Sequence, residues 1–249
     1  MTGCLAEIWR HPIKSHGRER VEQVALKASQ AMPGDRVWAV AHADSDADGS
    51  DWASCSNFSR TSRTPGLAPF WAKLQSGGEV NLRHTQLGEQ SFNLDDPADQ
   101  ERFVAWVAPL TPESQPAPNR VVKLEGRGFT DSDFPSVTLC NCASHRAVEE
   151  QLGQEISPLR WRGNLWVDGF APWAEWDWLG REIRIGEAVL VPRERTDRCP
   201  TTMANPETGE RDVPTVKALL DGWGHKDFSV RCVIVQGGAI REGDEVSLQ

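Results

Sequence analysis

The sequence lacks several features that would assign it to a broad class of proteins. It contains no tyrosine, and no apolar run approaches the roughly 20 residues that a membrane-spanning helix needs. Its net charge of −9 makes a nucleic-acid backbone an unfavourable general partner. The N-terminus has no basic segment followed by an apolar one, as a secretory signal peptide would have. We therefore expect a cytoplasmic protein whose partners include no nucleic acid and no membrane.

Common catalytic and nucleotide-binding motifs are also missing from the sequence. There is no GxxxxGK[ST] loop, no GxGxxG between a strand and a helix, no HExxH and no GxSxG. The stretch from Asp44 to Cys55 begins like a calcium-binding loop, but its twelfth position is Cys55 where a bidentate glutamate is needed. We interpret it as an acidic, solvent-exposed hairpin loop.

The chain has six cysteines and no CxxC pair. Because the chain is long and carries no secretory signal, free thiols are expected rather than disulfides. Cys140 and Cys142 would share one face of an extended chain, and no neighbouring His or Cys pair completes a zinc site. We predict that both are core thiols, with metal binding as the alternative.

Short segments rich in strand-forming residues dominate the secondary-structure pattern. These segments are 5–10, 21–26, 37–41, 80–84, 120–124, 165–168, 182–185 and 188–191. The last two strands, Val230–Gln236 and Ala239–Leu248, are expected to form a closing hairpin across Gly237–Gly238. Many short strands with few helices predict a mainly β fold with some α, a β-barrel decorated by helices.

Three helices are expected among these strands. Asp96 can cap the first, with Pro97 at its first position and apolar residues at helical spacing up to Leu110. The second spans 144–152 and stops at Gly153, and Pro214 opens the third. The proline-rich stretch 111–119 predicts a linker between a first domain at 1–110 and a second at 120–249.

Tryptophan is abundant, with 11 residues, and three of them lie in the segment 170–180. The segment could form an aromatic patch for a ligand, or a loop that packs over the end of the barrel. Buried indoles need partners for their N–H groups. Both interpretations stay open at this point.

Cys199 has the most distinctive chemical surroundings of the six cysteines. Arg195 and Arg198 precede it, and Thr201 and Thr202 follow it. Nearby arginines lower the pKa of a thiol, and a thiolate in a polar, cation-lined pocket suits a soft metal or a persulfide. The alternative is a buried structural thiol beside two surface arginines.

Several segments together resemble the MOSC domain family, named after the C-terminal domain of molybdenum cofactor sulfurases. RTDRCPTTMANPETGERD, from Arg195, is similar to the family signature, and LRWRGN, from Leu159, is similar to its "RFRxN" stretch. HPIKS, from His11, and GDRVW, from Gly34, resemble the "YPVKS" and "GDRxW" stretches of the β-barrel module that precedes many MOSC domains. The segment from Val235 to Val246 resembles the family's closing strands. The resemblance implies a MOSC-type β-barrel preceded by an N-terminal β-barrel-like module.

The same resemblance implies a function. Related amidoxime-reducing components bind the molybdenum cofactor (molybdopterin) through a cysteine thiolate and reduce N-hydroxylated compounds, releasing the oxygen as water. Carried over, it makes Cys199 the catalytic metal ligand and requires a separate electron-donor protein. It also suggests pyridoxal phosphate binding. The cofactor-binding positions that it implies are Lys14, Ser15, Arg36, Arg160, Arg162, Asn164, Arg198 and Thr201.

Two features set limits on this transfer. The family's "FGVY" is replaced by Phe228–Arg231, FSVR, and the segment 53–64 has its own wording, in which Cys55, Arg60 and Arg63 either line the pocket or form a surface loop. Asp244 and Glu175 lie in matching segments with no role beyond positioning. The alternative function is a cofactor or sulfur carrier that uses a Cys199 persulfide.

Overall fold

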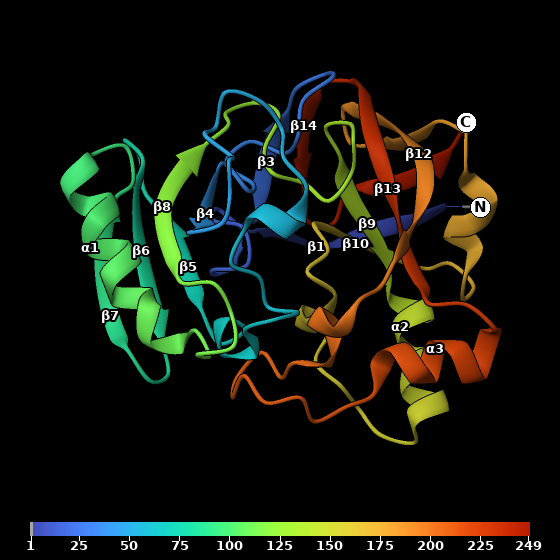
Figure 1. Cartoon of the computed structure of the whole chain (residues 1–249). Coiled ribbons are helices and arrows are strands. Elements are labelled where there is room, and N and C mark those ends of the chain that lie inside the picture. The colour runs from blue at the N-terminus through green and yellow to red at the C-terminus, as the bar shows by residue number, and fades with distance from the viewer. Residues whose placement is uncertain (1) are drawn as a thin grey trace.

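The computed structural model describes residues 2–249, and its larger part is a closed β-barrel (Figure 1). Seven strands pair in the order β10-β9-β13-β12-β11-β15-β1, and β1 pairs back to β10. All neighbours are antiparallel except β9 and β10, which are parallel. The barrel strands are β1 (Thr2–Arg10), β9 (Val137–Asn141), β10 (Leu165–Asp168), β11 (Ile183–Ile185), β12 (Ala188–Asp197), β13 (Asp227–Gln236) and β15 (Glu245–Leu248).

Alternating apolar side chains fill the barrel, as the two-residue period of a strand requires. Ile183 and Ile185 on β11 are fully buried, while Arg184 between them is exposed. Phe170 and Trp178 belong to the same core and meet edge to face, with ring centroids 4.7 Å apart. The tryptophan-rich segment therefore packs over the barrel, which was one of the two expected interpretations. It includes the short 3₁₀ helix η5 (Ala174–Trp178).

The N-terminal part forms a second core beside the barrel. β4 (Trp38–His42) pairs with β8 (Pro118–Lys123), and β5 (Trp71–Leu74), β6 (Glu79–His84) and β7 (Gly88–Asn93) form a three-stranded sheet. α1 (Pro97–Val107) covers this part at the left of Figure 1. The Asp96 side chain accepts a hydrogen bond from the Ala98 amide, which confirms the predicted cap.

Two further helices lie below the barrel in Figure 1. α2 (Cys142–Leu152) begins two residues before the predicted start, because Asn141 caps it, and ends at Gly153 in the left-handed conformation. Cys140 therefore lies on β9 and Cys142 on the helix, so the two do not share one strand face. α3 (Thr215–Trp223) follows Pro214 as predicted. None of the helices within residues 2–249 has the length and apolarity to cross a bilayer.

The predicted closing hairpin is wrong. β14 (Gly238–Arg241) pairs with β3 (Gln23–Leu26), not with β13, while β15 returns to β1 and β11. A Cβ on Gly237 would lie 2.7 Å from the Leu26 oxygen, and one on Gly238 would lie 2.5 Å from Glu187 Cβ. The two glycines thus permit a close crossing of chain segments rather than a reversal.

The N-terminal segment of the chain forms part of the barrel that the C-terminal half builds. β1 is a barrel strand, and the short β2 (Glu19–Arg20) adds to its end. β8 begins within the last two residues of the expected linker, continues beyond it, and pairs with β4. The division into 1–110, 111–119 and 120–249 therefore stays a prediction about the sequence.

Candidate cofactor and active site

Cys199 lies where β12 gives way to a short 3₁₀ helix, η6 (Pro200–Met203). Its backbone is extended, with φ −114° and ψ 176°, and Pro200 at the first helical position needs no amide partner. The Thr202 amide and hydroxyl both donate to the Cys199 carbonyl at 3.2 Å. The main chain is held in this way while the residue remains exposed, and the thiol donates to Thr201 Oγ1 at 3.3 Å.

Arg198 supports this turn from beneath. Its buried guanidinium donates to the Phe228 and Trp161 carbonyls at 3.0 and 2.8 Å and to Ser229 Oγ at 2.7 Å. Burial lowers the pKa of Arg198 to about 10. Arg195 instead stacks on Trp176, with 4.1 Å from its guanidinium carbon to the ring centroid. Of the two arginines near Cys199 in sequence, only Arg198 lines the cavity described next.

A cavity of about 240 Å³ opens beside the Cys199 thiol, between the N-terminal part and the barrel. Two acidic residues line it, Asp131 and Asp197, against seven basic ones, so the wall carries a surplus of five positive charges in a chain of net charge −9. Such a concentration favours an anionic ligand. The basic residues are Lys14, Arg36, Arg60, Arg160, Arg162, Arg198 and Arg231.

Lys14 comes to the cavity from the segment after β1. Its ammonium donates to the Phe129 carbonyl at 2.8 Å and pairs with Asp131 at 2.5 Å. Desolvation in the cavity opposes ionisation of Asp131, but the Lys14 charge outweighs it and lowers the pKa of Asp131 to about 2. The ammonium is thus fixed in place at the cavity wall, with two acceptors for its three N–H donors.

Arg36 is oriented by a buried carboxylate. Asp35 pairs with the Arg36 guanidinium and accepts the His11 amide at 2.7 Å, while Arg36 Nη2 donates to the Arg162 carbonyl at 3.0 Å. Burial raises the pKa of Asp35, but the Arg36 charge and the His11 contacts prevail and hold it well below its ordinary value.

Three cavity residues have a left-handed backbone that non-glycine residues seldom adopt. The φ angles of Ser15, Arg36 and Arg162 are 64°, 51° and 49°. Each such residue costs about 1–3 kcal/mol and persists only where the surrounding structure enforces it. Their concentration around one cavity indicates a site whose geometry takes precedence over local stability.

Arg160 and Arg162 flank Trp161 on the short helix η4 (Pro158–Trp161) and just after it. Arg160 donates to the Met203 carbonyl and pairs with Asp212 at 2.7 Å, while its Nε has no partner within residues 2–249. The side chain of Arg162 makes one long hydrogen bond, from Nη2 to the Gly17 carbonyl at 3.5 Å. Burial, and then the charges of Arg36 and Arg18, lower the pKa of Arg162 to about 9.

Comparison with protein families assigns both parts of the chain. The MOSC domain model matches residues 129–247, and the MOSC N-terminal beta barrel domain model matches residues 2–117. The chain belongs to the MOSC family. It is mainly β, with a closed barrel and an N-terminal MOSC β-barrel domain, as the resemblance implied. Membership of this family makes it a molybdenum-cofactor-related protein.

One of the solved structures similar to this chain agrees with its fold over the whole length. The YUAD protein from Bacillus subtilis is 13% identical and superposes with a TM-score of 0.51 over 100% of this chain and 96% of that one. YiiM proteins from Geobacillus stearothermophilus and Escherichia coli are 18% and 15% identical, with TM-scores of 0.36 and 0.34, over 45% of this chain and 53% of each of theirs. At these identities the likeness concerns the fold alone. No curated protein matches the chain.

Eight of the nine predicted site residues line this cavity beside Cys199, which we call the Cys199 cavity. Lys14, Ser15 and Arg36 come from the N-terminal domain, and the others come from the MOSC domain. Their roles toward a cofactor stay predictions. The five from the MOSC domain are Arg160, Arg162, Arg198, Cys199 and Thr201.

Asn164 does not line this cavity. Its side chain is buried, its Nδ2 donates to the Trp9 carbonyl at 3.1 Å, and its Oδ1 accepts the Thr138 amide at 3.1 Å. The amide therefore joins β1 to β9 next to β10, and both of its ends are already used. Its predicted contact with the cofactor stays a prediction, while the structure shows that this side chain links β1 to β9.

The structure adds residues that the sequence analysis missed. Asp131, Thr138 and Arg231 line the cavity, and only the last lies in a segment where the departure from the family pattern drew attention. Cys55 and Arg60, left open before, line it too. Trp161, Thr196, Asp197 and Thr202 also line it and lie inside the quoted motifs without having been assigned to the site. The other lining residues are Ser62, Thr130 and Ser136.

Glu175 and Asp244 have positioning roles. Glu175 is buried and accepts hydrogen bonds from Asn141 Nδ2 at 2.9 Å and Ser144 Oγ at 2.8 Å. Burial raises its pKa, against the effect of these two donors. Asp244 accepts the Arg241 amide at 2.8 Å in the turn between β14 and β15. Neither family description supports the pyridoxal phosphate binding that the resemblance suggested.

Proposed function

We propose that this MOSC protein is a molybdenum-dependent oxidoreductase that reduces N-hydroxylated compounds, with Cys199 as the metal ligand. The observation that carries the proposal is an exposed thiol in a cavity whose wall has a surplus of five positive charges. Molybdopterin ends in a phosphate, and its metal is soft enough for a thiolate. The cavity offers basic side chains for the phosphate and a thiol for the metal in one place.

The residues fit the cofactor chemically. Lys14, Ser15 and Arg36 offer an ammonium, a hydroxyl and a guanidinium, the groups that bind a phosphate in proteins. Burial lowers the pKa of Arg162, and repulsion from the cations Arg36 and Arg18 lowers it further. An anion between them would relieve that repulsion. When bound, the cofactor supplies two-electron redox chemistry at a metal with a soft ligand.

The chain's own groups would prepare the site for this chemistry. Thr202 donates to the Cys199 carbonyl, which fixes the main chain that carries the thiol. The Thr201 hydroxyl, 3.3 Å from the sulfur, can donate to the thiolate form. The cleaved bond is N–O. Two electrons from a separate electron-donor protein and two protons convert the N–OH group to N–H and release one water.

A cytoplasmic location is part of the proposal. All six cysteines are free, although Cys4 and Cys199 are exposed. Free exposed thiols are typical of a reducing compartment.

The experiment starts with metal and pterin content of protein made in a molybdenum-replete host. It then measures reduction of benzamidoxime by an artificial electron donor. We expect bound molybdenum and turnover in the wild type, and loss of turnover by at least a hundredfold in Cys199→Ala. Cys4→Ala, which removes another exposed thiol on β1, should behave like the wild type. Unchanged turnover in Cys199→Ala would refute the ligand role.

The exposure of Cys199 also favours a second candidate, a carrier that bears a persulfide on this thiol. An exposed sulfur is accessible to a donor and an acceptor protein. Cofactor or sulfane sulfur bound at Cys199, with no turnover of benzamidoxime by the metal-loaded protein, would favour the carrier over the reductase.

A further inference from the structure

A second cavity of about 330 Å³ lies on the N-terminal domain and shares one wall residue, Arg60, with the Cys199 cavity. Arg63 and His42 also line it, and none of the described residues that line it is an aspartate or glutamate. In a protein of net charge −9, a cavity with two arginines and no acid is a local reversal of charge. Such a cavity favours an anion.

Both guanidinium groups have donors to spare. The only side-chain hydrogen bond of Arg60 to another described residue runs from Nη1 to Cys55 Sγ at 3.2 Å, and sulfur is a weak acceptor. The Arg63 side chain forms no hydrogen bond or ion pair with any of residues 2–249, and it is exposed. By contrast, Arg36 and Arg160 are each paired with an aspartate.

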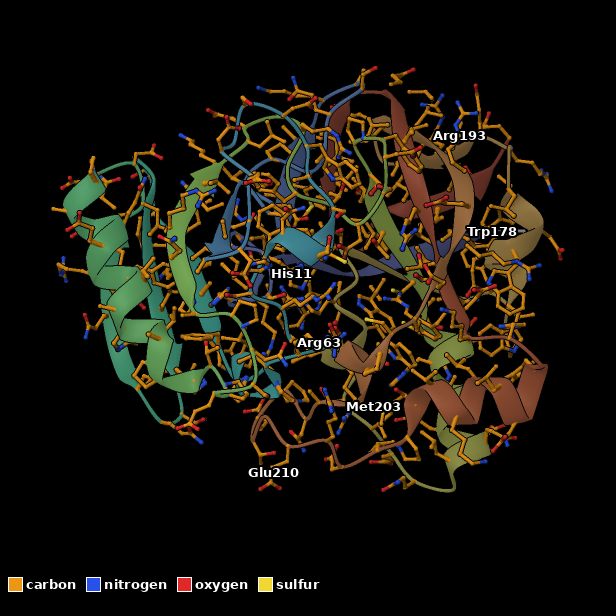
Figure 2. The ribbon with its side chains drawn as sticks, in the orientation of Figure 1. His11, Arg63, Trp178, Arg193, Met203 and Glu210 are labelled. Atoms are coloured by element: carbon orange, nitrogen blue, oxygen red, sulfur yellow. The ribbon has the colours of Figure 1, made fainter. Side chains whose placement is uncertain are left out.

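The backbone that carries these arginines is firmly anchored. Ser59 donates its amide to the Val40 carbonyl of β4 at 2.9 Å, and Phe58 next to it is buried against Phe129. The amides of Arg63 and Thr64 both return to the Arg60 carbonyl at 2.9 Å, which closes a turn. The two arginines therefore project from one tight turn fixed to a strand, and Figure 2 shows Arg63 near the centre of the molecule.

We propose that this second cavity, which we call the Arg63 pocket (His42, Phe58, Ser59, Arg60, Arg63 and Gln115), binds an anionic group at the far end of the substrate. A substrate whose N–OH group lies beside Cys199 would extend past Arg60, and its carboxylate or phosphate would contact Arg63. The inference rests on the proposed function and narrows it to N-hydroxylated compounds that carry a negative charge. An arginine fork suits either anion.

The test compares substrates that share the benzamidoxime core and differ in the group at its far end, on the metal-loaded protein. Benzamidoxime is neutral, 4-carboxybenzamidoxime carries a carboxylate, and 4-(phosphonomethyl)benzamidoxime carries a phosphonate. We expect a higher kcat/KM for at least one anionic compound, and the preferred one identifies the anion. Arg63→Gln should raise its KM by about tenfold, the value of one charge-assisted hydrogen bond, and change benzamidoxime by less than about twofold.

Arg193→Gln is the matched control, because Arg193 is also an exposed arginine and lies far from Arg63 in Figure 2. It should leave all three substrates unchanged. Equal kcat/KM for neutral and anionic substrates, or an equal response of all three to Arg63→Gln, overturns the inference and leaves the proposed function standing.

A second measurement separates the two proposals. Benzoate and phenylphosphonate are titrated calorimetrically into the full chain, wild type and Arg63→Gln. Binding of either that weakens about tenfold in the variant supports the Arg63 pocket, even if no amidoxime is reduced and the proposed function fails. No difference between the two proteins with either anion overturns the pocket.

Discussion

Acidification should destabilise this protein at the segment that brings Lys14 and Ser15 to the cavity. His16 is fully buried between Phe70 and Phe103, with ring centroids 5.7 and 5.6 Å away. Its Nδ1 lies 2.8 Å from the Lys14 carbonyl, while its Nε2 has no partner within residues 2–249. Protonation would place a second N–H where nothing accepts it. Burial accordingly lowers the pKa of His16 from 6.5 to about 4.

The loss of stability on acidification follows from the difference between the pKa of His16 in the unfolded chain and its pKa in the folded chain. Below pH 6.5 the unfolded chain binds a proton that the folded chain does not, so this contribution to stability is present above pH 6.5 and is lost as the pH falls towards 4. At about 1.4 kcal/mol per pH unit, His16 alone removes about 2.5 kcal/mol between pH 7.5 and 4.5. His11, whose pKa burial and Arg162 lower to about 3, adds a similar loss of about 2.7 kcal/mol. Together they approach the whole stability of a marginal domain.

The assay is urea unfolding followed by tryptophan fluorescence at several pH values from 7.5 to 4.5. His16→Asn keeps a donor for the Lys14 carbonyl but does not titrate, so it should lose about 2.5 kcal/mol less than the wild type over this range. Phe103→Leu, which disturbs the same packing but keeps the histidine, should keep the wild-type loss. If the wild type loses nothing between pH 7.5 and 4.5, or His16→Asn loses as much as the wild type, the reasoning is refuted.

Two further predictions concern the cavity beside Cys199 and its support. Asn164→Ala should lower the free energy of unfolding by about 1–3 kcal/mol, because it removes a buried and a partly buried hydrogen bond to the main chain, and should leave the molybdenum content of the folded protein unchanged. A stable variant that lacks molybdenum would support the direct cofactor contact instead. Phosphate should bind the cavity of the wild type and raise its melting temperature. Arg162→Met should match or exceed the wild-type melting temperature without phosphate, because it removes a buried cation that its neighbours repel, and should lose most of the rise that phosphate causes. An undiminished rise in thermal-shift measurements with phosphate would contradict it.

Local chemistry made parts of this fold predictable. Asp96 before Pro97, and Gly153 after an apolar pair, mark helix ends through interactions between close neighbours in sequence. Six of the seven barrel strands overlap segments that short runs of strand formers predicted, but β9 (Val137–Asn141) was not predicted. The Gly237–Gly238 pair misled the same reasoning, because a turn and a close crossing of two segments require the same absence of a side chain.

The candidate site was predictable as a set of motifs. The segments around Lys14, Arg36, Arg160 and Cys199 were assigned to one site by their resemblance to a family, and the structure brings them to one cavity. The types of residue and their order along the chain were enough to predict that these segments form one site. They did not distinguish Asn164, whose amide is consumed by the main chain, from its neighbours in the same motif.

Only the tertiary structure decided how charge is distributed over the molecule. An overall charge of −9 conceals a wall with a surplus of five positive charges, because the fold brings basic residues such as Lys14, Arg36 and Arg198 together from distant segments. Likewise, sequence placed Arg195 and Arg198 together beside Cys199, but one stacks on Trp176 and the other supports the thiol's turn. Sequence determines which groups are present and which local structures they favour. Whether a given charge is paired, buried or left free for a ligand depends on contacts between distant segments, and these exist only in the fold.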